Sequence, residues 1–371
     1  MFSNKKRLSA FILVSIVAFY HTIAMAQKAE DMSGSGKNTN SLVALPYAFY
    51  TPETNIAFGV GSIYSFRPTG SSISNRPSNV KFAATYTQKN QLIMSFIPEI
   101  YFNNQTMLFN GFYTYYKYPD KFWGIGNNTG DAAEEDFEPK YLKTFTNIQK
   151  KITSNLYIGI RNQVEYLDII EKEDDGQLAN AGIVGSDAGI ASGLGIIFNY
   201  DSRDNIYYPT SGQYHQIFMV DFDDYFLSDY DFQLVSIDLR RFIQIHNSHV
   251  LAFQTYNVFI NGEPPFQMLA LLGGAYWMRG NYLGRYRDKS MITFQGEYRF
   301  PLIWRFGGAL FGGIGDVASR VQKFETRHIK YSLGFGIRFM FDSQERINAR
   351  LDFGLSNDGK SGIYALVLEA F

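Results

Sequence analysis

Residues 330–341 read Lys-Tyr-Ser-Leu-Gly-Phe-Gly-Ile-Arg-Phe-Met-Phe, with an aromatic or aliphatic side chain at every second position. The positions between them hold mostly small or polar residues and one arginine, Arg338. Residues 347–355 repeat the pattern, and there Arg350 and Asp352 alternate with apolar residues. Because successive side chains of a strand point to opposite faces, this two-residue period predicts strands with one apolar face and one charged face.

The N-terminus has the organisation of a secretory signal peptide, which we place at residues 1–26. A basic Lys5-Lys6-Arg7 precedes the apolar run 11–20, and Ala24-Met25-Ala26 matches a cleavage site. The apolar run is shorter than the ~20 residues of a membrane-spanning helix. Residues 27–41, rich in Gly, Ser, Lys and Asn, are expected to form a flexible tether.

Strands with one charged face occur in membrane barrels and in soluble sandwiches. A barrel turns the apolar face to lipid, whereas a sandwich turns the charged face to water. Strands of about ten residues, the export signal and the aromatic last residue, Phe371, favour the barrel. We therefore predict an all-β fold, a single transmembrane antiparallel barrel over residues 42–371.

Composition agrees with a barrel and excludes other classes. The chain has 371 residues, with 26 Tyr, 33 Phe and 33 Gly, as expected for aromatic girdles and a crowded lumen. It has no cysteine, so a disulfide-stapled fold is excluded. A net charge of −1 provides no electrostatic footprint for nucleic acid, which we exclude as a partner.

Periodicity predicts sixteen strands, an even number that places both ends of the chain on the same side of the barrel. Short connections such as 103–106, 153–155, 246–248 and 342–346 are expected to face the periplasm, and long ones the exterior. The predicted strands are 43–50, 55–66, 79–88, 91–102, 107–117, 141–152, 156–170, 191–202, 212–222, 231–245, 249–260, 291–300, 307–316, 329–341, 347–355 and 362–371.

One stretch carries a family resemblance. Residues 279–288 contain Arg279-Gly280-Asn281-Tyr282, which resembles the arginine-glycine-aromatic loop motif of BamA/TamA-type surface-antigen barrels of the bacterial outer membrane. Further matches are Glu297-Tyr-Arg-Phe-Pro301, Phe311-Gly-Gly-Ile-Gly-Asp316, Phe122-Trp-Gly-Ile-Gly-Asn127 and Asp201-Ser-Arg203-Asp204-Asn205. Family members normally carry POTRA domains before the barrel. Residues 27–41 are too few for one, so we expect a short form without them.

The resemblance implies a loop folded into the lumen with Arg279 at its tip, beside Gly280 and Tyr282. Glu297, on the inward face of its strand, is the expected partner, because a guanidinium can bind a carboxylate through two hydrogen bonds. Asp316 is expected to join this lumenal pairing. The alternative is that Arg279 is an ordinary solvated loop arginine.

Asp201, Arg203 and Asp204 allow two interpretations. They form either an ion-pair network at the periplasmic rim or a turn stabilised by Asx hydrogen bonds that leads to Pro209. Both remain open at this point.

The seam between the first and last strands has two unusual residues. Pro46 cannot donate a ladder hydrogen bond, although it could simply begin the strand with its missing donor facing water. Glu369 shares a face with Phe371, which predicts a carboxylate near lipid at the periplasmic rim. We therefore expect a seam that opens, admitting a client strand or a second copy of the barrel.

These features favour an outer-membrane biogenesis factor that inserts or translocates proteins, or handles lipids. A passive solute channel and a structural outer-membrane protein are the alternatives. An enzyme is not expected, because no serine–histidine–acid trio is evident among the four histidines after residue 26. His246 and His249 lack a third ligand, so we predict no metal site and no cofactor. Expected partners are outer-membrane lipid and lipopolysaccharide, client outer-membrane proteins or a homodimer partner.

Overall fold

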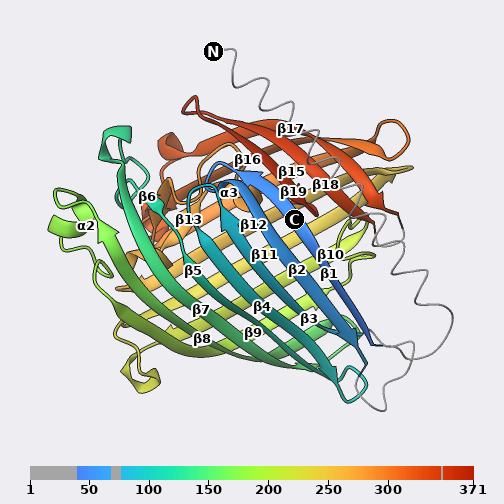
Figure 1. Ribbon diagram of the computed structural model, residues 1–371, viewed down its shortest axis with the longest axis horizontal. Helices are drawn as coiled ribbons and strands as arrows, with labels where there is room; N and C mark the ends of the chain where they lie inside the picture. Colours follow the sequence, from blue (N-terminus) through green and yellow to red (C-terminus); the bar gives the residue numbers. More distant parts are fainter. Residues whose placement is uncertain (1–39, 68–76, 344–345) are drawn as a thin grey trace.

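The computed structural model describes residues 40–67, 77–343 and 346–371. Sixteen antiparallel strands in these residues close into one barrel, which Figure 1 shows with blue β1 beside red β19. The predicted fold class and strand number are confirmed. The barrel strands are β1 (Ser41–Thr51), β2 (Asn55–Phe66), β3 (Ser78–Thr87), β4 (Leu92–Phe102), β5 (Met107–Lys117), β7 (Glu135–Lys151), β8 (Leu156–Lys172), β9 (Gly189–Asp201), β10 (Gly212–Phe222), β11 (Phe232–His246), β12 (His249–Gly262), β15 (Ser290–Pro301), β16 (Phe306–Ala318), β17 (Lys330–Asp342), β18 (Ile347–Ser356) and β19 (Ser361–Val367).

The alternation of side chains explains why these strands form a barrel rather than a sandwich. On β17, Leu333 and Phe335 point outward and are 66% and 56% exposed. Arg338 on the same strand and Asp352 on β18 point inward and are 3% and 0% exposed. The charged face therefore lines the lumen, and the apolar face forms the outer wall that a membrane requires.

The barrel closes through a very short ladder. All eleven residues of β1 are paired with β2, from Ser41↔Ser65 to Thr51↔Asn55. On its other edge, β1 pairs with β19 at a single position, Tyr50 opposite Ala365. The seam is thus the least paired junction between neighbouring strands of the described barrel.

Two strand boundaries differ clearly from the predicted ones. β7 begins at Glu135 rather than 141, because the short strand β6 (Asp120–Phe122) pairs with its outer end. β19 ends at Val367 rather than 371, because Leu368 adopts the left-handed conformation (φ 70°) and turns the chain inward. The signal peptide 1–26 and the tether, apart from its last two residues, lie outside the described residues.

The connection 263–289, which we call the lumen loop, is the largest folded insertion. It carries the two-stranded sheet of β13 (Ala270–Leu272) and β14 (Tyr286–Asp288), and the short helix α3 (Gly274–Trp277). Leu272 and Met278 of this loop are buried in the main apolar cluster, together with residues of β9–β12. The other short helices are η1 (Asp131–Ala133), α2 (Gln177–Asn180), η2 (Asp224–Phe226), η3 (Phe266–Met268), η4 (Val321–Lys323) and η5 (Thr326–His328). None of the helices in the described part of the chain is long and apolar enough to cross a membrane.

Candidate functional site

Two glycines allow the lumen loop to lie directly on the barrel wall. Gly280 has φ 107°, a conformation that L side chains rarely adopt. A Cβ atom there would lie 3.0 Å from the main-chain carbon of Leu355, and a Cβ at Gly354 would lie 2.8 Å from that of Arg279. Backbone therefore meets backbone at this point, and the position of the Arg279 side chain is defined by β18.

Arg279 is fully buried and pairs with two carboxylates. Its Nη2 lies 2.7 Å from Oε2 of Glu297 on β15, and its Nη1 lies 2.6 Å from Oδ2 of Asp352 on β18. The guanidinium also stacks 3.5 Å from the ring centre of Phe311. The expected partner, Glu297, is thus present, and the interpretation as a solvated loop arginine is wrong. Asp352 was missed as a partner, although its inward position in the 347–355 pattern marked it as lumenal.

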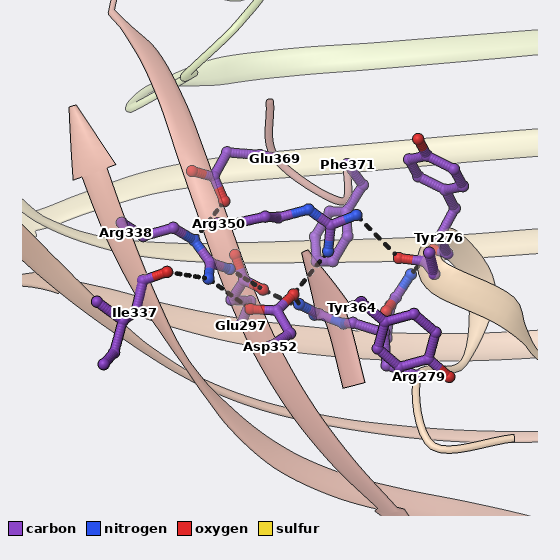
Figure 2. Close-up of polar contacts among 12 residues, drawn as sticks. Tyr276, Arg279, Glu297, Ile337, Arg338, Arg350, Asp352, Tyr364, Glu369 and Phe371 are labelled. Atoms are coloured by element: carbon purple, nitrogen blue, oxygen red, sulfur yellow. Dashed lines mark hydrogen bonds and ion pairs between the residues drawn. The ribbon is translucent and has the colours of Figure 1, made fainter. Parts of the chain in front are cut away.

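Further arginines extend the pair into a network (Figure 2). Arg338 lies 3.3 Å from Glu297, 2.5 Å from Asp352 and 2.8 Å from Glu369. Arg350 pairs with Asp352 at 2.6 Å. Arg299 pairs with Glu297 at 2.7 Å. Four guanidiniums and three carboxylates are therefore paired with one another, which leaves one net positive charge and offsets part of the cost of burying them.

Asp316 does not join this network, contrary to expectation. Glu297 lies opposite Phe311 on β16, so it is Phe311 that reaches the arginine. Asp316 is five residues further toward the outer end of the strand and accepts a hydrogen bond from Asn127 Nδ2 at 3.2 Å. Asp316 therefore lies too far along β16 to take part in the network around Arg279.

The tip of the lumen loop contacts both sides of the seam. The main-chain N–H of Gly280 donates to the hydroxyl of Tyr364 on β19 at 3.0 Å. The N–H of Leu283 donates to the carboxylate of Glu53, in the β1–β2 turn, at 2.9 Å. Burial raises the pKa of Glu53, even though the hydrogen bond from Leu283 lowers it. The loop therefore braces the outer end of the seam from inside.

The rest of the lumen loop docks on the connection between β5 and β7. Tyr282 donates to Asp120 at 3.0 Å, and Arg285 lies 2.9 Å from Asp131. The N–H of Gly126, within the Phe122–Asn127 motif, donates to the carbonyl of Arg287 at 2.8 Å. The Phe122–Asn127 motif therefore helps to hold the lumen loop in place.

Comparison with known proteins identifies the family. A model of the Omp85 superfamily domain matches residues 58–364. The chain belongs to the Omp85 superfamily. The predicted resemblance and the predicted outer-membrane location are confirmed. A comparison with curated protein sequences found no match.

Two solved Omp85-type structures are similar in fold. BamA from Haemophilus ducreyi lacking POTRA domains 1–3 aligns with 90% of this chain and 71% of that chain, at 14% identity and a TM-score of 0.60. CdiB from Acinetobacter baumannii aligns with 90% of this chain at 10% identity and a TM-score of 0.55. This chain covers 60% of CdiB, which is less than two thirds of its length.

Asp201, Arg203 and Asp204 show features of both interpretations, although their ion pairs are two separate ones. Arg203 pairs with Asp201 at 2.8 Å. Asp204 accepts the N–H of Thr210 at 2.8 Å and pairs with Arg346 at 2.7 Å. Although burial raises it, these hydrogen bonds lower the pKa of Asp204 to about 2. The segment is a hydrogen-bonded turn that is also tied to a second turn by an ion pair.

The expectation that Glu369 lies near lipid is wrong. The left-handed Leu368 breaks the alternation of β19, so the following residues enter the lumen. Glu369 is held there by Arg338 at 2.8 Å and by Asn348 at 2.9 Å. Phe371 packs in a buried cluster with Phe242 and Ala252 and is 4% exposed.

Pro46 does not begin its strand, as one interpretation held. It lies inside β1, five residues after Ser41, and is paired with Val60 of β2. On the β19 side it falls in the part of β1 that precedes the single closing pair at Tyr50. Among the described residues, no three His, Asp or Glu side chains are grouped as a metal site would require.

Proposed function

We propose that this Omp85 barrel is an outer-membrane biogenesis factor that opens at the β1–β19 seam to insert or translocate proteins, or to move lipid. The observation that carries the proposal is the closure of the seam at Tyr50↔Ala365 alone. Backbone N–H and C=O groups cannot be left unpaired in lipid without a cost of several kcal/mol each. The rest of the β1 edge is therefore a template for an incoming strand.

The C-terminal segment supports the same mechanism. Residues 368–371 would prolong β19 if they stayed in the wall, but the lumenal network holds Glu369 and the main-chain oxygen of Phe371 instead. Arg299 donates to that oxygen at 3.0 Å. Residues 368–371 can therefore either bind the lumenal network or extend the hydrogen-bonded ladder between β1 and β19. Which of the two they do sets the length of the seam. Pro46, which cannot donate a ladder hydrogen bond, weakens the opposite edge.

Each surface of the barrel has a different proposed partner. Outer-membrane lipid contacts the apolar wall, lipopolysaccharide contacts the outer loops, and either a client strand or a second copy pairs with β1. No chemical reaction is involved. A passive channel is the competing function, and it is disfavoured by the lumen loop, whose tip lies inside the barrel and contacts Asp352 and Tyr364 of the wall.

Locking the seam tests the proposal. The chain has no native cysteine, so Tyr50→Cys with Ala365→Cys can form one defined disulfide at the closing pair. Oxidised protein in vesicles should lose insertion of an added outer-membrane client, and reduction should restore it. The matched control is Ala83→Cys with Ser95→Cys, a paired position between β3 and β4.

Full insertion activity in the locked barrel would contradict the seam mechanism. A large, steady conductance of the intact protein in planar bilayers would instead favour the channel. Intermolecular crosslinks formed by the single Tyr50→Cys variant would identify a second copy as the strand that pairs with β1.

A further inference from the structure

The turn between β15 and β16 carries three exposed apolar side chains in succession. Leu302, Ile303 and Trp304 are 56%, 77% and 76% exposed. The turn lies at the same end of the barrel as the short connections 103–106, 152–155 and 247–248, which consist of Asn, Gln, Thr and Ser apart from a single exposed apolar residue, Ile152. Three successive exposed apolar side chains therefore distinguish the β15–β16 turn from these connections.

The backbone of the turn holds Trp304 in a costly conformation. Trp304 has φ 55°, whereas left-handed positions in the neighbouring turns are occupied by polar residues such as Asn103, Asn104 and Ser248. A bulky aromatic residue is rare in this conformation and is strained there. Two main-chain hydrogen bonds between residues 302–306 close the turn, at 2.9 Å each. The fold thus maintains a strained aromatic residue in a rigid, exposed position.

The apolar surface of the turn continues the outer wall of the barrel. The ring of Trp304 lies 6.3 Å from that of Phe306 and 6.0 Å from that of Phe339. Below them the outward positions of β16 and β17 are exposed and apolar, as at Leu310 and Ile337. The apolar surface therefore extends from the wall to the tip of the turn.

A cation accompanies the aromatic residue. The guanidinium of Arg305 lies 5.6 Å from the centre of the Trp304 ring, and its Nη1 donates to the carbonyl of Phe341 at 3.3 Å. Arg305 is itself exposed. An apolar ring beside an exposed cation suits the boundary between acyl chains and phosphate groups.

We propose that residues 302–305 form an anchor that inserts into the periplasmic leaflet of the outer membrane and binds phospholipid there. Leu302 and Trp304 contact the upper acyl chains, and Arg305 faces a headgroup phosphate. The occupant is phospholipid rather than a protein, because the turn is continuous with the lipid-facing wall. The inference stands whether or not the seam opens.

Fluorescence quenching tests the anchor in the folded protein reconstituted in phospholipid vesicles. Trp304→Asn should fold, since asparagine tolerates positive φ, and its spectrum subtracted from that of the unaltered protein isolates the Trp304 emission. That emission should be quenched by lipids brominated near the headgroup end of the acyl chain. It should be quenched less by lipids brominated at the methyl end and little by aqueous acrylamide.

The matched control moves the indole to a polar turn. Trp304→Asn with Asn104→Trp places tryptophan at φ 54° at the same end of the barrel. Bromine quenching at residue 104 should be weaker by about twofold or more, because residues 103–106 of that turn are all polar. Trp304 emission quenched by acrylamide and not by bromine would overturn the proposal. Protection from both quenchers would also overturn it, since a protein would then cover the turn.

Discussion

The carboxylate of Glu53 accepts a hydrogen bond from the main-chain N–H of Leu283 at 2.9 Å, and so ties the first hairpin of the barrel to the lumen loop. On the other side of the seam, Tyr364 of β19 holds Gly280 of the same loop. The loop tip therefore joins two strands that share only one ladder pair, Tyr50↔Ala365. This brace limits how freely the outer end of the seam can separate.

Glu53→Ala should loosen the brace. The variant leaves the partly buried N–H of Leu283 without its acceptor, at a cost of about 1–3 kcal/mol. We expect the folded band on a cold detergent gel to disappear at a lower temperature than for the unaltered protein. Glu263→Ala, which removes an exposed pair with Lys289, serves as the control and should have little effect. Equal heat resistance of the two variants would show that Glu53 does not stabilise the seam.

Removing one partner of the buried network should be strongly destabilising. Arg279→Ala leaves Glu297 and Asp352 with one fewer cation, and breaking a buried pair in this way costs about 3–5 kcal/mol. Asp352→Asn should also destabilise the barrel, while Asp316→Asn should do so much less, because an amide oxygen can still accept from Asn127. Urea unfolding in detergent or lipid measures the difference.

Exchanging the charges of the central pair should fail to rescue it. In the double variant Arg279→Glu with Glu297→Arg, the new guanidinium would face Arg299 and Arg338, which both contact Glu297 in the native network. The double variant should therefore be no more stable than either single one. Recovery to the native unfolding midpoint would mean that Arg279 and Glu297 act as an isolated pair.

Gly280→Ala should displace the lumen loop. The added Cβ meets the main chain of Leu355 at 3.0 Å, and φ 107° is unfavourable for alanine, so a loss of more than about 1 kcal/mol is expected. Gly359→Ala is the matched control, since Gly359 has φ 80° but an added Cβ there would meet no atom within 4 Å. A larger effect at residue 280 isolates the contact with β18 from backbone strain. Equal losses of stability in the two variants would show that the contact between the lumen loop and β18 does not contribute.

Asp204 should contribute an acid-sensitive component of stability. Its pKa is lowered from 3.8 to about 2, so the contribution is present above pH 3.8 and is lost as the pH falls through about 2. The difference in unfolding free energy between the unaltered protein and Asp204→Asn should shrink over that interval. The matched control is Asp187→Asn, which removes an exposed carboxylate paired with Lys172.

Local sequence patterns predicted most of the wall of the barrel. The two-residue period identified which side chains of 330–341 and 347–355 face the lumen, because that choice depends only on the alternation within each strand. The same rule placed Glu297 on an inward face, and the loop motif then associated it with Arg279. Strand ends such as those of β2, β5 and β10 followed from turn residues adjacent in the chain.

Alternation assigns a side chain to the lumen but not to a depth within it. Depth depends on the register between strands, and that register brought Asp352 to Arg279, 73 residues away, while it left Asp316 near the outer end of β16. A single left-handed residue, Leu368, decided that Glu369 meets Arg338 rather than lipid. The sequence by itself therefore determined the faces of the strands, since these are set by neighbours along the chain. The tertiary structure decided which buried charges meet, because only closure of the barrel fixes their relative heights and offers each one its partners.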